Sequence, residues 1–424
     1  MDDRAQSMLS SRSSNCHGDY VSEQTLRTRR LIIALCAAMF ALGQFHRAAG
    51  SVFAPILIDR FSVSATVISG LVSIMFLAAV LTQLPLGAAL DRYGPRLMMS
   101  CSVTVIALGT VLFAVGQSYE DMFAARIIIG FGMASLGASI HVLVAWSFSR
   151  REFGYVNGMV ITLGSAGGML GTYPLALALA HFEWSTVFAA TAIAAFALVV
   201  AIWSIVPSTP PNQQELFSDQ PGSYLDLIQL PEVRRILALG LVTFAPMTTI
   251  TGLWGGPFLQ DVHGFSAEKS GAVLLALFAG SVVAAFMFGH LDRSISQRKA
   301  MILTAAGIST TCLALLALLP APGPIVTTAL LLVIIFCQTF YIPLGAHMRK
   351  VVPIQLVGRA SILLSLVGVA AIPAMQTGFG AILDLARTAG FGIADQFRFS
   401  FGAMALAMAL SVTCYAFVRQ ADDA

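Results

Sequence analysis

The chain has 424 residues, of which 57% are hydrophobic and 11% are charged, and its net charge is +3. Soluble globular proteins carry about 25% charged residues, so this composition excludes an ordinary soluble protein and indicates a membrane protein. The small net charge gives no support for a nucleic-acid partner, and the six cysteines form neither a metal-ligand spacing nor a disulfide framework.

Residues 1–30 are polar and rich in serine, and they lack the apolar core of a signal peptide. We therefore predict a disordered cytoplasmic tail. Twelve apolar runs follow, each long enough to cross a hydrocarbon core about 30 Å thick as a helix of about 20 residues. The predicted spans are 31–58, 64–90, 97–117, 121–148, 153–178, 183–206, 234–259, 267–290, 300–320, 324–347, 355–383 and 397–419.

The longest polar connection, 207–233, separates six spans from six. Similar sequences recur at a nearly constant offset: Asp91 and Asp292 are 201 residues apart, and Gly154 and Gly358 are 204 apart. This parallel duplication predicts an all-α membrane protein with two six-helix halves related by a pseudo-two-fold axis. The expected units are 1–30, 31–206, 207–233 as a cytoplasmic central loop, 234–419, and a cytoplasmic tail at 420–424.

The Lys and Arg residues predict the orientation. If the N-terminus is cytoplasmic, 18 of the 24 lie in cytoplasmic segments and 4 on the opposite side, while Arg47 and Arg126 lie inside spans. The positive-inside rule then places both termini in the cytoplasm. We expect a multi-pass monomer in the plasma membrane, which is the inner membrane if the source is a Gram-negative bacterium.

The loop after the second span reads GAALDRYGPR and has the spacing Gly-x-x-x-Asp-Arg-x-Gly-x-Arg, with the residues Gly87, Asp91, Arg92, Gly94 and Arg96. This pattern resembles the signature loop of the major facilitator superfamily. RIIIGFG in the fourth span, which contains Arg126, is similar to a second motif of that family. The resemblance implies a twelve-helix secondary transporter in which this loop latches the two halves on the cytoplasmic side. The alternative interpretation is an ordinary positively charged loop.

Two features depart from the patterns of this family. The second copy of the loop, GHLDRSISQR, keeps Asp292 and Arg293 but has Ile295 in place of the glycine, which makes a second latch less certain. The fifth span has Tyr173 before Pro174, where drug antiporters of the family usually carry Gly-Pro. The second departure argues against drug/proton antiport.

The ionisable residues inside the predicted spans are cationic or histidines. Arg47 lies near the middle of the first span, whereas all 21 Asp and Glu residues fall in loops, tails or span ends. Because an unpaired buried arginine is costly and an anion offsets that cost, we infer an anionic substrate. The alternative for Arg47 is a structural arginine bonded to backbone carbonyls or to Gln83.

Candidate substrate-binding residues are those placed at membrane depth in the spans that would line a central site: Arg47, His46, Gln376, Trp254, Gln338 and Tyr341. Candidate coupling residues are Arg126 and His141. Each has a plainer alternative. Helical geometry points His46 and Arg47 about 100° apart, so His46 is as compatible with the core as with a cavity. Arg126 fits a helix contact, His141 fits a core histidine, and the others fit packing.

These observations favour a secondary transporter that moves a small organic anion by alternating access. The seventh span lacks the arginine that organophosphate exchangers of the family carry, which favours a monoanion such as a carboxylate. A coupling proton would travel on a histidine or on the substrate, with uniport and exchange as alternatives. The rival hypotheses are drug efflux and a non-transporting sensor with the same fold. We expect no enzyme activity, cofactor or metal, because the sequence has no ligand cluster, nucleophile elbow or buried acid pair.

Overall fold

The computed structural model describes residues 27–207, 224–294, 297–320, 322–353 and 356–418. Within these ranges the chain forms helices and short connections, without a β-strand. Twelve of its helical segments are long and apolar enough to cross a membrane, which confirms the predicted number. They are Arg27–Ala48, Ala65–Gln83, Arg92–Val115, Tyr119–Ser147, Arg151–His181, Trp184–Ile205, Pro231–His263, Ala267–Asp292, Arg298–Leu318, Pro324–Val351, Val357–Thr388 and Ile393–Ala416.

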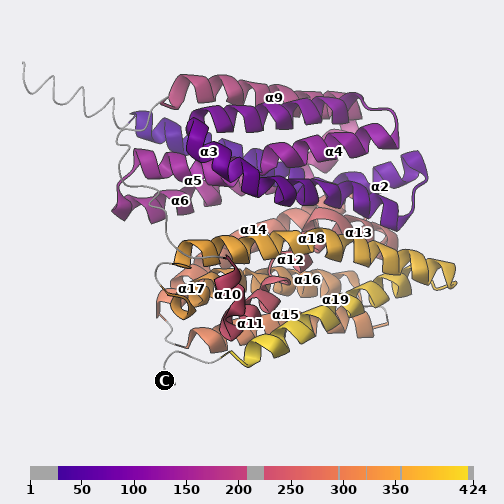
Figure 1. The fold of residues 1–424 in the computed structure, drawn as a ribbon. Coiled ribbons are helices and arrows are strands. Elements are labelled where there is room, and N and C mark those ends of the chain that lie inside the picture. Colours follow the sequence, from indigo (N-terminus) through magenta and orange to yellow (C-terminus); the bar gives the residue numbers. More distant parts are fainter. Residues whose placement is uncertain (1–26, 208–223, 295–296, 321, 354–355, 419–424) are drawn as a thin grey trace, which may run out of the picture.

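The helices form two bundles that lie against each other (Figure 1). The first half contains the helix Arg27–Ala48 and then α2 (Gly50–Phe61), α3 (Ala65–Val115), α4 (Tyr119–Met133), α5 (Leu136–Ser147), α6 (Arg150–Gly164), α7 (Ala166–Leu170), α8 (Tyr173–His181) and α9 (Trp184–Ile205). The second half contains α10 (Tyr224–Gln229), α11 (Pro231–Gly240), α12 (Ala245–Thr249), the π-helix η1 (Ile250–Trp254), α13 (Gly255–His263), α14 (Ala267–Ser294), α15 (Arg298–Leu318), α16 (Pro324–Cys337), the 3-10 turn η2 (Gln338–Phe340), α17 (Tyr341–Val351), α18 (Val357–Thr388) and α19 (Ile393–Ala416).

Several boundaries differ from the prediction. The first helix begins at Arg27 instead of residue 31, breaks at Ala49, and continues as α2 to Phe61. The central loop was expected to extend from 207 to 233. Helical structure already begins at Tyr224, because α10 and the start of α11 occupy the last part of that range. Residues 1–26, 208–223 and 419–424 lie outside the described residues, so most of the predicted tails and loop do too.

The turn between the second and third spans is so tight that both spans belong to one element, α3. Gly94 interrupts the helix with φ 75° and ψ 168°, a conformation that glycine adopts without a steric penalty. The glycine of the motif therefore has a backbone role in this structure.

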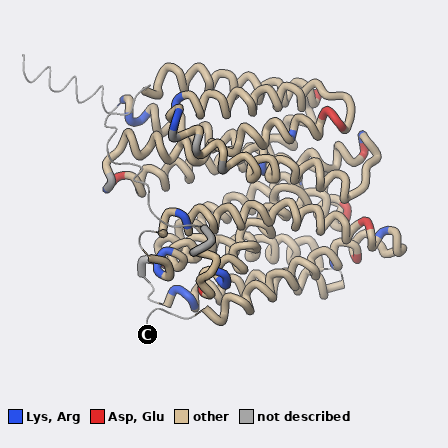
Figure 2. Tube along the Cα trace, viewed as in Figure 1, with Lys and Arg blue, Asp and Glu red and all other residues tan. Residues whose placement is uncertain are grey.

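The two ends of the molecule differ in charge. We call the end with Arg27 and Val418 the near end and the opposite end, with Arg60 and Asp384, the far end. Figure 2 shows Lys and Arg gathered mainly at the near end, whereas Asp and Glu occur mainly at the far end. This asymmetry is the structural counterpart of the positive-inside pattern in the sequence.

The two halves share one apolar core. Buried Val52 and Phe53 of the first half belong to the same packed cluster as Leu253 and Trp254 of the second half. Across this interface α3 packs along α18. The interface also includes α14, which packs on α7 and α8. The candidate site is positioned by the part of the interface that lies along the first helix, α2, α3, η1, α13 and α18.

Candidate functional site

The two halves approach most closely at a seam formed by Gly50, Ser51, Thr251, Gly252 and Gly256. The Ser51 hydroxyl donates a hydrogen bond of 2.8 Å to the Thr251 carbonyl oxygen. A Cβ atom at Gly50 would lie 2.1 Å from the Gly252 carbonyl oxygen, and one at Gly256 would lie 1.9 Å from the Ser51 carbonyl oxygen. Side chains at these positions would force the backbones apart, so glycine sets the contact between the halves.

A proline and a π-helix shape the backbone at the seam. Pro55 in α2 has no N–H, so it leaves the carbonyl oxygen of Ser51 without its usual helical donor. Pro257 in α13 likewise leaves the carbonyl oxygen of Leu253, next to the seam residue Gly252, without its usual donor. In the adjacent π-helix the Gly255 amide donates to the Ile250 carbonyl oxygen, five residues earlier. Such π segments are rare and often occur at functional sites.

Arg47 lies one helical turn before Ser51. Helical side chains lean toward the N-terminus of their helix, so this side chain leans from the seam toward the near end. Its Nε atom is buried and has no hydrogen-bond partner, and the Arg47 backbone carbonyl oxygen packs against Gly252. In the described part of the chain, no carboxylate forms an ion pair with Arg47. The Arg47 backbone therefore lies at the interface, and its guanidinium group has unsatisfied hydrogen-bonding capacity at Nε.

Gln376 on α18 and Trp254 on η1 lie on the same side of the interface. The fully buried Gln376 side chain donates from Nε2 to the Thr248 carbonyl oxygen at 3.3 Å, and its Oε1 has no partner. Trp254 donates from Nε1 to the Gln376 carbonyl oxygen at 3.3 Å and stacks on Phe379 at 5.6 Å between ring centroids. The structure thus joins these two predicted residues by a hydrogen bond. Trp254 belongs to the same π-helix as Gly252, which the Arg47 carbonyl oxygen contacts.

His46 and Arg126 lie inside the first half. The buried His46 ring places Nε2 3.2 Å from the Thr110 hydroxyl. Arg126 is 1% exposed and donates to the carbonyl oxygens of His46 and Val72, both at 3.2 Å. Its guanidinium group also lies over the Phe53 ring, 5.4 Å from the centroid. Arg126 therefore ties the first helix and α3 to α4, and the His46 side chain points into the first half toward Thr110.

The remaining predicted residues are separated from this group. His141 on α5 is exposed, with Nδ1 2.6 Å from the Gly137 carbonyl oxygen. Gln338 in η2 is fully buried, directs Nε2 toward the Met408 sulfur at 3.5 Å, and leaves Oε1 without a partner. The Tyr341 ring packs on Phe244 at 5.0 Å.

The predicted cytoplasmic gate residues lie at the near end of the molecule. Arg96 donates to the Trp203 carbonyl oxygen at 2.6 Å and lies over the Trp203 ring, and Arg92 lies over Tyr93. Gly87 has open space around it, and Gly94 forms the tight turn.

In the second copy of the loop, Asp292 forms an ion pair with Arg298. The side chains of Asp91 and Arg293 lie outside the described set. The described contacts of Arg92, Arg96 and Asp292 are thus with residues of their own half.

From the sequence, Thr249 is one of several polar residues of the seventh span that could line a cavity, and Asp384 is one of the carboxylates nearest to lipid depth, but neither is assigned a role of its own. Thr249 has a fully buried hydroxyl with no hydrogen-bond partner, and it lies 202 residues after Arg47. The repeat offset of 201–204 residues could have identified it as the equivalent of Arg47 in the second half. Asp384 contacts residues more than 300 positions away, for which the sequence carries no local signal.

A profile of the Major Facilitator Superfamily matches residues 33–375, which is most of the chain. The chain belongs to the Major Facilitator Superfamily. This membership confirms the predicted resemblance and identifies the protein as a multi-pass membrane transporter of that superfamily. Among curated proteins, the "Uncharacterized transporter YybO" of Bacillus subtilis (strain 168) is 29% identical over 161 residues, which are 38% of this chain and 37% of that relative's length.

Solved structures share the fold. A bacterial homolog of the human lysosomal transporter Spinster, in an inward-facing and occupied conformation, superimposes with a TM-score of 0.75 at 15% identity, covering 92% of this chain and 96% of the other. A point mutant of the nucleoside transporter NupG gives a TM-score of 0.74 at 14% identity, with coverage of 92% and 100%. A D-xylose-proton symporter gives 0.72 at 15% identity, with coverage of 92% and 98%. These similarities confirm the twelve-helix, two-half architecture.

Proposed function

We propose that this superfamily member transports a small organic monoanion, such as a carboxylate, by alternating access, and that the anion pairs with Arg47. The observation that supports the proposal is the buried Nε of Arg47, which has no hydrogen-bond partner beside the seam. A guanidinium group held at membrane depth without an anion is costly, and a carboxylate that accepts two parallel N–H···O bonds offsets that cost.

The other polar groups near Arg47 favour a single negative charge. The equivalent position in the second half is Thr249, a neutral hydroxyl, and the predicted residue Gln376, which bonds to the neighbouring Thr248 carbonyl oxygen, is a neutral amide. A dianion such as a phosphate ester would leave its second charge without a cation here. Thr249, Gln376 and Trp254 are therefore the groups we propose to contact the uncharged part of the substrate.

A coupling proton would be carried by a histidine or by the substrate itself. His141 is exposed at the surface of α5, whereas His46 is enclosed beside Thr110. We therefore assign His141 as the first histidine to test in a proton-coupled cycle. Arg126 would act in the cycle by holding three spans together, through its two carbonyl contacts.

We further propose that the protein is a monomer in the plasma membrane with both termini in the cytoplasm. The Lys and Arg residues at the near end support this orientation (Figure 2). The near end is accordingly the cytoplasmic end in the proposal, and the far end faces outward.

The experiment is a flux assay in proteoliposomes with a panel of small carboxylates, preceded by a thermal-stabilisation screen of the same panel on purified protein. We expect one or more carboxylates to raise the unfolding temperature and to be transported. Arg47→Ala should abolish both effects, and Arg47→Lys should weaken binding, because a lysine cannot form the paired hydrogen bonds.

The matched control is Arg60→Ala, which removes an exposed arginine that bonds to Gln117 at the far end. This variant should transport as the wild type does. Normal carboxylate uptake by Arg47→Ala, or transport of cationic drugs in preference to carboxylates, would contradict the proposal.

A further inference from the structure

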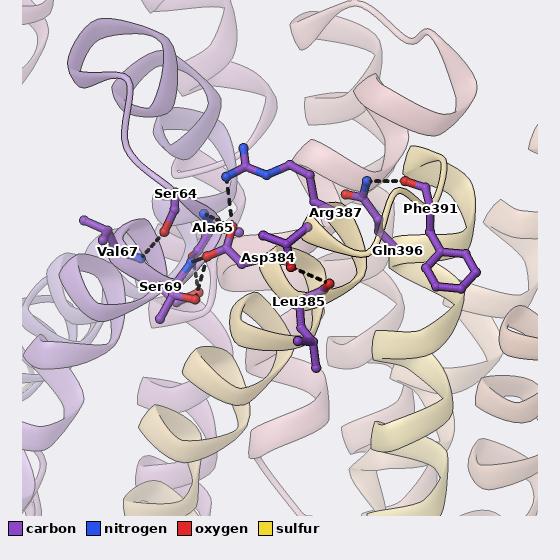
Figure 3. A network of polar contacts seen from close by, with 11 residues as sticks. Ser64, Ala65, Val67, Ser69, Asp384, Leu385, Arg387, Phe391 and Gln396 are labelled. Atoms are coloured by element: carbon purple, nitrogen blue, oxygen red, sulfur yellow. Dashed lines mark hydrogen bonds and ion pairs between the residues drawn. The ribbon is translucent and has the colours of Figure 1, made fainter.

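At the far end, a carboxylate from one half meets the start of a helix from the other (Figure 3). Asp384, in the last turns of α18, accepts a hydrogen bond from the Ala65 amide at 3.1 Å through Oδ1. Its Oδ2 accepts from the Thr66 amide at 2.8 Å and from the Thr66 hydroxyl at 2.6 Å. Ala65 and Thr66 are the first two residues of α3, so one side chain satisfies two amides that a helix cannot satisfy internally.

This arrangement is an N-terminal cap supplied across the interface. The cap within α3 itself is the Ser64 hydroxyl, which accepts from the Val67 amide at a longer distance of 3.4 Å. A negative charge beside a helix N-terminus is further stabilised by the helix dipole. Asp384 is largely shielded, with 20% of its side chain exposed, and Arg387 approaches it from the solvent side at 3.6 Å. The carboxylate is therefore held in place on both sides.

The helices below the cap are in close contact. A Cβ atom at Gly380, one turn before Asp384, would lie 2.6 Å from the Ala65 carbonyl oxygen. Two turns deeper in α3, the Ser73 and Thr377 hydroxyls are 3.4 Å apart. Because these contacts require the helix surfaces to touch, the Asp384 bonds form only when the far end is closed.

The pairs define an antiparallel register between the two helices. Residue numbers add to 449 for Ala65 with Asp384 and to 450 for Ser73 with Thr377. If the same register continues, Asp91, at the other end of this part of α3, falls opposite Gly358 at the start of α18. Each helix thus carries an aspartate about where its partner begins: 26 residues after Ala65 in α3 and 27 residues after Val357 in α18.

We propose that Asp384 is the latch of the far end: its bonds to Ala65 and Thr66 stabilise the conformation closed at that end and must break in each transport cycle. When the halves separate there, the two α3 amides pass to water, and the helix keeps only its Ser64 cap. The latch uses the alternating access of the proposed function but does not depend on the identity of the substrate.

The test measures the opening of the far end directly. Spin labels are placed at Glu120→Cys and Ala389→Cys, two exposed far-end positions in different halves, with the six native cysteines replaced by alanine. Double electron–electron resonance on the full chain in nanodiscs should give mainly short distances. Asp384→Ala should raise the ratio of open to closed molecules about tenfold, because it removes the charge-assisted bonds that exist only in the closed state.

Two further variants make the result specific. Thr66→Val removes one of the three bonds and leaves the carboxylate, so it should shift the ratio about threefold. Asp395→Ala removes a far-end carboxylate that pairs with Arg398 within the second half, at 2.6 Å, and should leave the distances unchanged.

A wild-type distance distribution in both Asp384→Ala and Thr66→Val would overturn the proposal, and so would an equal shift in Asp395→Ala. If Asp384→Ala does not fold, Thr66→Val and Asp384→Asn decide the question. Failure of the anion proposal appears in a different measurement, as absence of carboxylate flux by the wild type, and leaves the distances unaffected.

Discussion

Two arginines inside the spans of the first half have different environments, although Nε has no partner in either. Arg126 is buried and reaches two backbone carbonyl oxygens and an aromatic ring, so its charge is partly satisfied by the protein. Arg47 is partly exposed and lies beside the other half. The same residue type therefore serves as a helix contact at one position and as a candidate ligand at the other.

At the residue scale we predict that Arg126→Lys destabilises the protein. A lysine keeps the charge but cannot reach both carbonyl oxygens or lie over Phe53 as a flat group, so the free energy of unfolding should fall by about 1–3 kcal/mol. Thermal unfolding followed by tryptophan fluorescence measures the change. Arg60→Lys, at an exposed site, is the control, and equal unfolding temperatures for the two variants would contradict the assigned role.

The residue scale also shows where sequence reasoning reaches its limit. The depth of Arg47 and the scarcity of intramembrane acids follow from counting residues along apolar runs. The partners of Arg126, by contrast, are carbonyl oxygens 54 and 80 positions away, which any residue could supply. Asp384 was visible as a carboxylate near lipid depth, but its partner helix lies 318 positions away and depends on how the halves dock.

At the element scale, the spans follow from hydropathy, and their irregularities follow from proline and glycine. The predicted first span of 31–58 is in fact two helices with a break at Ala49, beyond which Gly50 and Pro55 shape the seam. The sequence shows these residues but not which helix they face. The sequence shows Pro246 and Gly252 as helix breakers in the seventh span, but it does not show the π-helix at Ile250–Trp254, because that geometry depends on packing against α2.

Glycine at the seam yields a prediction with a matched control in the same region. Gly50→Ala would place a methyl group 2.1 Å from the Gly252 carbonyl oxygen, so the helices must separate, and the unfolding temperature should fall by several degrees. Gly70→Ala on α3 meets no atom within 4 Å and gains helix propensity, so it should be neutral or stabilising by up to about 1 kcal/mol.

The measurement is thermal unfolding of the purified variants, together with the far-end distances described above. A Gly50→Ala variant with the unfolding temperature and far-end distances of the wild type would show that α2 and η1 can separate without cost.

At the scale of the whole molecule, the two-half architecture and the number of spans were predictable from the sequence, because both depend on composition over long stretches and on a repeated motif. The docking of the halves was not, because it depends on contacts such as Ser51 with Thr251, which are 200 positions apart. The predicted orientation in the membrane rests only on the distribution of Lys and Arg, so it can be tested independently of how the halves dock.

For orientation we compare two exposed alanines at opposite ends, Ala300 at the near end and Ala389 at the far end. Each is changed to cysteine in the cysteine-free chain and treated in intact cells with a membrane-impermeant maleimide. Ala389→Cys should react at once, and Ala300→Cys only after permeabilisation, because the near end holds most of the positive charge. The reverse pattern would invert the proposed topology.

The seam also has a mechanical consequence. Gly50 and Gly252 are 202 residues apart, at the repeat offset, so they are equivalent residues of the two halves that meet near the pseudo-two-fold axis. A contact between equivalent residues is a natural pivot when the halves rock about an axis in the plane of the membrane. With α18 about 48 Å long, a rotation of about 10° moves its ends by about 4 Å but a group about 5 Å from the pivot by less than about 1 Å. Arg47, one turn from Ser51, would therefore stay almost still while the two ends of the protein exchange access.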